Sequence, residues 1–303
     1  MSDTLAVNEI YLSLQGESTF AGLPCVFVRL TACNLRCSYC DTAYAFTEGR
    51  KRTLAEIRSE VRRLAEPFAK TPSETNPAPS PSSAFASSFG PTAPERPAAL
   101  ARERGESGGG PEGNNPAASG FQFPSFGGGR SGFPRLPLVE LTGGEPLLQS
   151  NSLPLMKQFC DDGFTVLVET SGALDISPVD PRVRRVMDLK CPSSGEAARN
   201  RWENLRHLKA TDEIKFVIGT IEDYEWVKEQ ILTHKLDAIC PLLVSWLHPL
   251  APGQQDKSLK PVPPGMTTIS RRELAEGIIA DALPVRFQAQ LHKIIWPPEQ
   301  RGV

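Results

Sequence analysis

The 303-residue sequence has no long hydrophobic run, and no stretch approaches the roughly 20 apolar residues that a helix needs to cross a bilayer. It also opens without the basic and apolar segments of an export signal. Neither sign of charge is in excess, because 33 Lys and Arg face 35 Asp and Glu, a net charge of -2. This balance excludes the basic field typical of proteins that bind nucleic acid or anionic membranes. We therefore expect a cytoplasmic protein with neither partner.

Histidine is scarce, with 4 residues, whereas cysteine is present seven times. An odd number of cysteines without an export signal argues against a disulfide framework. Hydrophobic residues make up 40% of the chain, which is enough for a sizeable core. Proline is in excess, because 28 residues are about twice the usual share.

The excess proline gathers in one segment, 71–137, which holds 12 Pro, 11 Gly and 10 Ser. Val, Ile, Met, Tyr, Trp and Cys are absent from it. Such a composition buries too little apolar area to offset the entropy of ordering the chain, so the segment is predicted to be a disordered insertion. Residues 1–70 and 138–303 are then one domain that the insertion splits in sequence.

Strands and helices alternate through this domain. Thr53 and Glu56 form a capping box, and the helix after it is expected to end at Pro67. Further helices are predicted around 200–208, 224–234 and 271–283. Short connections between strands and helices imply parallel strands joined by crossovers, and about six central strands predict an open, partial α/β barrel. The strands are expected at 25–30, 138–142, 164–169, 186–190, 213–218, 240–245 and 285–290.

Polar residues follow the carboxyl ends of these strands, where parallel α/β proteins bind ligands. They are Thr142 to Glu145, Glu169, Lys190, Ser245 and Gln290.

Three cysteines follow the first of these strands on one short loop: Cys33, Cys37 and Cys40, with the spacing C-x3-C-x2-C. Iron-sulfur clusters are held by cysteine thiolates, and three of them suffice when one iron stays open. A structural zinc site needs a fourth protein ligand, which would have to come from elsewhere in the chain.

The cysteine spacing, with an aromatic residue before Cys40, resembles the signature of the radical S-adenosylmethionine (SAM) enzymes. Gly143-Gly144-Glu145-Pro146 resembles their GGE motif. The chain outside the insertion is similar to the 7-carboxy-7-deazaguanine synthase family. That resemblance rests on the segments 11–17, 29–42, 141–146, 168–172 and 290–303. The sequence departs from the family at Ser18, where Gly is common, and at Asp188-Leu189, where many relatives have Ser-Pro.

The resemblance implies a lyase that converts 6-carboxy-5,6,7,8-tetrahydropterin to 7-carboxy-7-deazaguanine and ammonia, in 7-deazapurine (queuosine) biosynthesis. Its cofactors would be a 4Fe-4S cluster on Cys33, Cys37 and Cys40, SAM, and Mg2+ on Thr42. The SAM contacts implied are Tyr39, Cys40, Asp41, Gly144, Glu169, Ser171, Lys190 and Ser245. The substrate contacts implied are Leu14, Gln15, Gly16, Arg29, Thr142, His292 and Val303.

Arg29 suits the pterin carboxylate on physical grounds, because a guanidinium binds a carboxylate through two parallel hydrogen bonds. A flavodoxin or ferredoxin-type reductant and a homodimer are expected by resemblance. Two alternatives stay open: an activase of a glycyl-radical enzyme with the same cluster, and a non-enzymatic zinc or electron-transfer module.

Overall fold

The computed structural model describes residues 3–69 and 136–303, so the predicted insertion lies almost wholly outside the described residues. One sheet of nine strands runs through the described part in the order β3-β1-β2-β4-β5-β6-β7-β8-β9. All neighbours from β2 to β9 are parallel, whereas β1 pairs antiparallel with β2 and β3. The strands are β1 (Thr4–Leu14), β2 (Pro24–Leu30), β3 (Arg50–Thr53), β4 (Leu138–Gly143), β5 (Val166–Thr170), β6 (Arg184–Asp188), β7 (Glu213–Ile218), β8 (Leu242–Trp246) and β9 (Arg286–Gln288).

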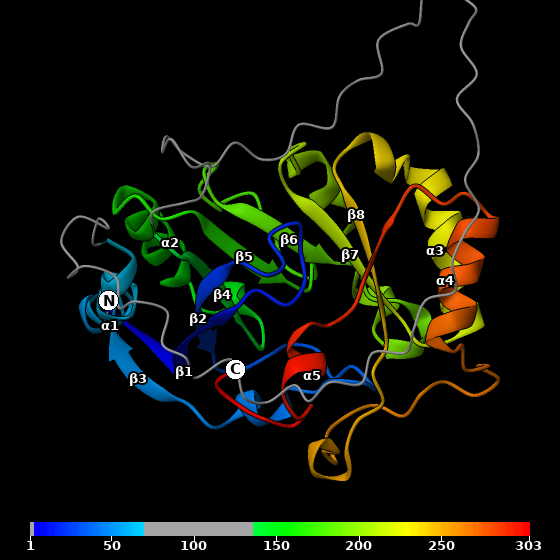
Figure 1. Ribbon diagram of the computed structural model, residues 1–303, viewed down its shortest axis with the longest axis horizontal. Coiled ribbons are helices and arrows are strands. Elements are labelled where there is room, and N and C mark those ends of the chain that lie inside the picture. The colour runs from blue at the N-terminus through cyan, green and yellow to red at the C-terminus, as the bar shows by residue number, and fades with distance from the viewer. Residues whose placement is uncertain (1–2, 70–135) are drawn as a thin grey trace, which may run out of the picture.

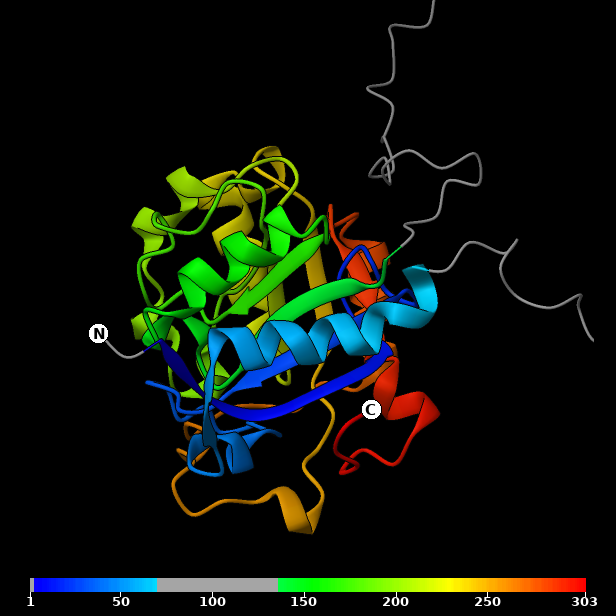
Figure 2. The same ribbon diagram turned by 90° about the vertical axis from the view of Figure 1, so that its left-hand side faces the viewer.

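The sheet curves into an open barrel with helices on its outer side (Figures 1 and 2). The helices are α1 (Leu54–Ala69), α2 (Ser152–Asp161), α3 (Ile221–His234), α4 (Arg271–Ala280) and the short α5 (His292–Ile295). The 3-10 turns are Ala43–Phe46, Pro146–Leu148, Pro192–Ser194, Ala197–Arg199, Trp202–His207, Leu236–Ala238 and Pro252–Gln254. No helix in the described ranges has both the length and the apolar character to cross a membrane.

Apolar residues on alternate positions of the strands build the core on the outer face. One cluster joins β1, β2, β4 and β5 to α1 and α2, and a second joins β6, β7 and β8 to α3 and α4. The opposite face of the strands turns inward. Its lower rungs, those farther from the carboxyl ends of the strands, form a third apolar cluster that includes Phe27, Leu138, Leu167 and Val186. Residues that alternate along a strand point to opposite faces, so this arrangement leaves the upper rungs of the inner face for the site.

The prediction of an open α/β barrel is confirmed, and each of the seven segments expected to be strands contributes one parallel strand to the sheet, where about six central strands were expected. The capping box is present, since Thr53 N donates to Glu56 Oε2 (2.7 Å) and Glu56 N donates to Thr53 Oγ1 (3.2 Å). The predicted end of this helix at Pro67 was wrong, because α1 contains Pro67 and ends at Ala69. The segment 200–208 forms only a 3-10 helix over Trp202–His207.

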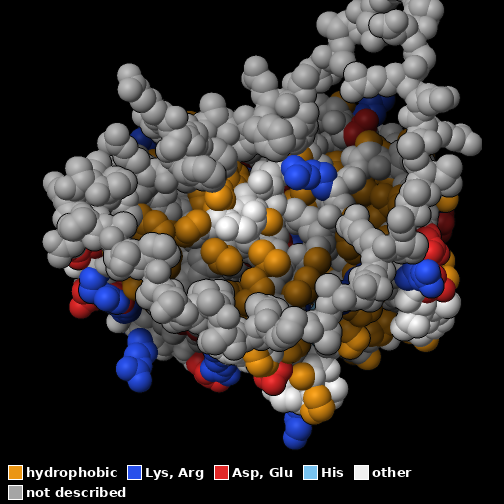
Figure 3. Space-filling view, viewed as in Figure 1, with side chains coloured by type: hydrophobic (Ala, Val, Ile, Leu, Met, Phe, Trp, Pro, Cys, Tyr) orange, Lys and Arg blue, Asp and Glu red, His pale blue; other side chains and the backbone are white. Residues whose placement is uncertain are grey.

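Figure 3 shows hydrophobic side chains gathered in the middle of the face seen in Figure 1, with the charged side chains mostly toward its rim.

Candidate active site

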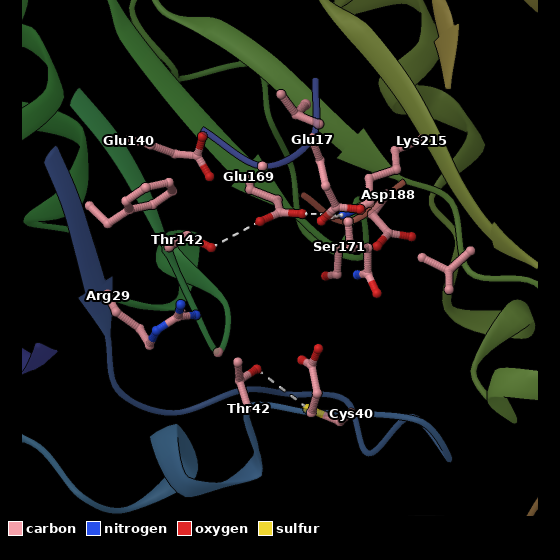
Figure 4. A pocket seen from close by; sticks show the side chains of 18 of the residues that line it. Glu17, Arg29, Cys40, Thr42, Glu140, Thr142, Glu169, Ser171, Asp188 and Lys215 are labelled. Carbon is pink, nitrogen blue, oxygen red and sulfur yellow. Dashed lines mark hydrogen bonds and ion pairs between the residues drawn. The ribbon is translucent and has the colours of Figure 1, made fainter. Parts of the chain in front are cut away.

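A cavity of about 230 Å³ opens at the carboxyl ends of the parallel strands, between the inner face of the barrel and the cysteine loop. Its wall repeats every second residue along each strand: Phe27 and Arg29, Glu140 and Thr142, Glu169 and Ser171, Lys215 and Val217. This period of two is the inner face of the strands. Figure 4 shows Arg29, Thr142 and Glu169 facing this space, with Cys40 and Thr42 across it.

The three thiols of the cysteine loop, Cys33, Cys37 and Cys40, all line the cavity, and none is in a disulfide. Burial raises the pKa of Cys37 to about 12, against the opposing charge of Lys190. Burial also raises the pKa of Cys33, although the backbone N–H of Leu35, which donates to Cys33 Sγ (3.4 Å), opposes this increase. Among residues 3–69 and 136–303, no group of three His, Cys, Asp or Glu side chains could hold a single metal ion. Three free thiols at one cavity are nevertheless the donor set that an iron-sulfur cluster uses.

The cysteine loop is hydrogen-bonded to the turn that follows β6. Arg36 N donates to Glu196 Oε1 (2.7 Å), and Ser38 donates through N to the Ser194 carbonyl (3.0 Å) and through Oγ to the Ser193 carbonyl (2.7 Å). The thiols therefore sit on a backbone fixed by another part of the chain.

Gly144 packs against the start of the cysteine loop, where a Cβ would overlap the Ala32 carbonyl. Glu145 N donates to that same carbonyl (2.8 Å). The Glu145 carboxylate is fully buried and accepts from Thr170 Oγ1 (2.9 Å), from Ser171 N (2.8 Å) and from Ser171 Oγ (2.6 Å). Glu145 thus stays behind the cavity wall and fixes Ser171, which lines the cavity.

Arg29 lies on β2 with its guanidinium partly engaged. Its Nε donates to Glu9 Oε1 (2.8 Å) and its Nη2 to the Tyr11 hydroxyl (2.9 Å), while Tyr44 also donates to Glu9 Oε1 (2.8 Å). Burial, which lowers the pKa of Arg29, is outweighed by Tyr11, Tyr44 and Glu9, so the pKa lies above its usual value. The side chain is a permanent cation in a fixed plane on the cavity wall.

Lys215, a buried lysine in the middle of β7, joins three elements. Its Nζ lies 3.0 Å from Glu17 Oε2 and 2.7 Å from Glu169 Oε1. Burial alone would raise the pKa of Glu169, but the Lys215 charge and hydrogen bond outweigh it and hold the pKa at about 2. Thr142 Oγ1 donates to Glu169 Oε2 (3.0 Å), and Ser245 Oγ donates to Glu17 Oε1 (2.9 Å).

The C-terminal segment closes the cavity from the other side. Leu291 N donates to the Gly16 carbonyl (3.0 Å), and Lys293 Nζ lies 2.6 Å from Asp41 Oδ2. Burial would raise the pKa of Asp41, but Lys293 outweighs it and holds the pKa at about 2. Val303 lines the cavity, and the Arg301 guanidinium lies 3.8 Å from the centroid of the Tyr44 ring.

Of the residues that the sequence nominated, the structure brings all to this cavity except Glu145 and Ser245. Ser245 is fully buried, and its side chain is connected to the site through the hydrogen bond that it donates to Glu17. Their roles toward cluster, SAM, Mg2+ and substrate stay predictions. Several other lining residues were not predicted from the sequence: Tyr11, Phe27, Glu140, Lys215, Leu247 and Lys293. Charged residues inside an apolar strand, as in Glu140 and Lys215, were the available signal for two of them.

Comparison with known proteins places the chain in a family. It is 36% identical over 302 residues to the 7-carboxy-7-deazaguanine synthase of Koribacter versatilis, with 99% of this chain and 100% of the relative covered. The chain belongs to the 7-carboxy-7-deazaguanine synthase family. It is also 32% identical over 302 residues to the synthase of that name from Chlorobaculum tepidum, with 99% and 97% covered. The family resemblance stated from the sequence is therefore confirmed.

A comparison with models of protein families gives no match. Among solved structures, the chain is similar in fold to QueE from Escherichia coli, with a TM-score of 0.56, 17% identity and 95% of each chain covered. This likeness concerns the fold alone.

Proposed function

We propose that this protein converts 6-carboxy-5,6,7,8-tetrahydropterin to 7-carboxy-7-deazaguanine, with loss of ammonia. As a member of the 7-carboxy-7-deazaguanine synthase family it is an enzyme of 7-deazapurine biosynthesis. A glycyl-radical activase and a zinc or electron-transfer module are not favoured by these relatives. The observation that carries the proposal is that three free thiols and the fixed guanidinium of Arg29 face one cavity.

The family resemblance implies a radical SAM enzyme, and the residues of the cavity fit its two cofactors. Cys33, Cys37 and Cys40 would hold the 4Fe-4S cluster through their thiolates. Gly144, Asp41, Ser171 and Lys190 line the cavity beside the thiols and, with Tyr39, Cys40 and Glu169, are the proposed SAM contacts. When bound, the cluster and SAM supply radical abstraction of a hydrogen atom. Ser245 would act indirectly, because its hydroxyl donates to Glu17 and so fixes the position of that side chain.

The protein's own residues orient the substrate. Because Glu9 and Tyr11 fix the guanidinium plane of Arg29, its remaining N–H groups are ready for the pterin carboxylate. Phe27 lines the cavity and stacks on Tyr11 (centroids 5.2 Å apart), which offers an apolar surface to a flat heterocycle. Leu14, Gln15, Gly16, Thr142, His292 and Val303 complete the proposed substrate contacts. The C-terminal segment would limit the access of water.

Mg2+ is the third proposed cofactor, with Thr42 as its protein ligand. One hydroxyl suffices only when waters and substrate oxygens complete the octahedron, as magnesium often allows. Thr42→Val should therefore lower the turnover rate, and the turnover that remains should no longer depend on Mg2+. Thr47→Val, an exposed threonine of the same loop, is the matched control. An unchanged Mg2+ requirement in Thr42→Val would remove Thr42 from this role.

The central experiment is turnover under strictly anaerobic conditions. Reconstituted protein should hold about four irons per chain. With carboxytetrahydropterin, SAM, dithionite and Mg2+ it should release the deazaguanine acid, detected by mass spectrometry. Cys37→Ala should lose both iron and activity, whereas Cys160→Ala, a thiol away from the cavity, should keep both. A fully loaded wild-type protein that forms no product would refute the proposed reaction.

The physiological setting is also a proposal by resemblance. We infer a flavodoxin or ferredoxin-type reductant, a homodimer and a cytoplasmic location. Replacement of dithionite by reduced flavodoxin should support turnover, and light scattering should give the mass of a dimer. No turnover with either protein reductant, or a monomeric mass, would contradict the respective inference.

The domain organisation proposed from the sequence, one domain from 1–70 and 138–303, has its own test. Deletion of 71–137 with a short Gly-Ser joint should preserve turnover. Loss of turnover in a protein that keeps its folded spectrum would show that the segment contributes to function.

A further inference from the structure

Glu140 has a carboxyl side chain and lies in the middle of a buried strand. The proposed function assigns no role to it. It lies on β4, is 3% exposed and lines the cavity. Gln15 donates from Nε2 to its Oε2. Figure 4 shows its carboxyl group pointing into the space that Thr142 and Glu169 also face. A buried carboxyl group on an otherwise apolar rung lowers the stability of the fold unless hydrogen-bond donors satisfy it. Its position on the cavity wall therefore indicates a ligand that supplies such donors.

The register of the sheet places Glu140 relative to Arg29. Arg29 pairs with Thr142 in one rung, and Phe27 pairs with Glu140 in the rung two residues deeper. Two residues along a strand span about 7 Å. Arg29 and Glu140 are thus separated along the barrel by a distance comparable to a fused bicyclic ring, and Phe27 lies beside Glu140 in the deeper rung.

The next rung down is closed by apolar side chains. Cys25 pairs with Leu138, and both belong to the cluster with Phe27, Leu167 and Val186. A flat ligand whose carboxylate is on Arg29 would therefore end at Glu140 and not pass below it. The groups at that end of a pterin are the 2-amino group and the adjacent ring N–H, two parallel donors.

We propose that Glu140, positioned by Gln15, binds the 2-amino group and adjacent ring N–H of the pterin and so selects a 2-aminopteridine. This inference rests on the proposed function, because it assumes a carboxypterin substrate.

The chemistry of the carboxyl group suits two donors. Each carboxylate oxygen has two lone pairs, so Oε2 can accept from Gln15 and from a ligand at once. Burial and the neighbouring Glu169 raise the pKa of Glu140 well above its usual range, against the charge of Lys215. N–H donors of a ligand would favour the anion. Lys215 itself pairs with Glu17 and Glu169, and no ion pair of Glu140 is found within residues 3–69 and 136–303.

The experiment compares two stable ligands on the cluster-reconstituted protein with SAM: 6-carboxypterin and 6-carboxylumazine, in which an oxygen replaces the 2-amino group. Dissociation constants come from fluorescence or calorimetry. Wild-type protein should prefer the pterin at least about ten-fold, because the 2-oxygen of the lumazine faces one oxygen of Glu140 and leaves that oxygen without a donor, while only the ring N–H still donates. Glu140→Gln offers one donor and one acceptor, which match the lumazine. Its preference should fall about ten-fold or more, or reverse.

Glu213→Gln is the matched control, since Glu213 is also a buried glutamate of the inner face but does not line the cavity. It should keep the wild-type preference. Should Glu140→Gln not fold, Gln15→Met tests the positioning role and should also reduce the preference. An unchanged ratio in a folded variant overturns the assignment of Glu140 and leaves the proposed function intact. A wild-type protein that binds neither ligand overturns the pterin substrate itself.

Discussion

Lys215→Met is the most informative single perturbation of the three charged residues Glu17, Glu169 and Lys215 on the cavity wall. The lysine ammonium is 5% exposed and lies between the carboxylates of Glu17 and Glu169, which come from the N-terminal loop and from β5. Methionine has a similar length and removes only the charge. Two carboxylates then remain with no cation between them.

The magnitude follows from burial. Removing one partner of a buried ion pair costs about 3–5 kcal/mol. Glu17 and Glu169 keep 16% and 30% of their side-chain exposure, so solvent screens part of that cost and about 2–4 kcal/mol is expected. For a domain of this size, 1 kcal/mol shifts Tm by about 2–4 °C, which gives a loss of roughly 4–16 °C.

The loss should also depend on pH. The folded pKa of Glu169 is about 2, below its ordinary value, so Lys215 contributes stability above the ordinary pKa of a glutamate and loses it as pH falls toward 2. In the variant the carboxylates can take up protons instead. The deficit of Lys215→Met relative to wild type should therefore be larger at pH 8 than at pH 4.

Thermal unfolding of both proteins at the two pH values, followed by circular dichroism, measures the effect. Lys157→Met is the control, because Lys157 forms an exposed i,i+4 pair with Asp161, and exposed pairs of this kind contribute little to stability. A Lys215→Met variant no less stable than this control, or one with the same deficit at both pH values, would refute the reasoning.

Three further changes test the cavity wall. Arg29→Lys keeps the charge but loses the planar fork, so kcat/KM for the pterin should fall about ten- to hundred-fold, and a change below three-fold would exclude Arg29 as the carboxylate ligand. Gly16→Ala would place a Cβ 2.6 Å from His292 Nδ1, so the His292 side chain, a proposed substrate contact, must move and KM should rise; steady-state kinetics with an unchanged KM would contradict this. Lys293→Met leaves Asp41 without its cation, so the dissociation constant for SAM should rise in calorimetry, and equal affinity would show that the pair does not support SAM binding.

The sequence predicted the parallel strands because each is a short apolar run bounded by breakers, but it missed the antiparallel β1 and β3. β3 is only Arg50–Thr53, with two exposed residues, so it has no hydrophobic pattern of its own and exists because β1 offers it an edge. The segment 200–208 was expected to be a regular helix. Asn204 is fully buried there, and its side chain donates to the carbonyls of Gly172 (2.9 Å) and Leu174 (2.7 Å), so tertiary contacts shape this turn.

The site residues likewise fall into those that the sequence could reveal and those that it could not. Residues at strand ends, such as Thr142 and Glu169, could be found because the carboxyl ends of parallel strands share one edge. Glu140 lies one rung deeper, and the parity of the strand would have pointed to it. No local pattern could reveal that Lys293 meets Asp41, because the two are joined only when the chain closes on itself.

Ser18 shows why the departure from the family's usual glycine is tolerated. Its φ is 63°, in the left-handed region that favours Gly, and such a residue needs other contacts to hold it. Those contacts are present: Ser18 N donates to Gln288 Oε1 (2.8 Å), Gln288 Nε2 donates to the Ser18 carbonyl (2.7 Å), and Ser18 Oγ accepts from Phe20 N (3.0 Å). The loop that carries Gln15 and Glu17 is thus fixed to β9. Because Gln15 positions Glu140 and Glu17 pairs with Lys215, the strain at Ser18 is held by the same contacts that order the cavity wall.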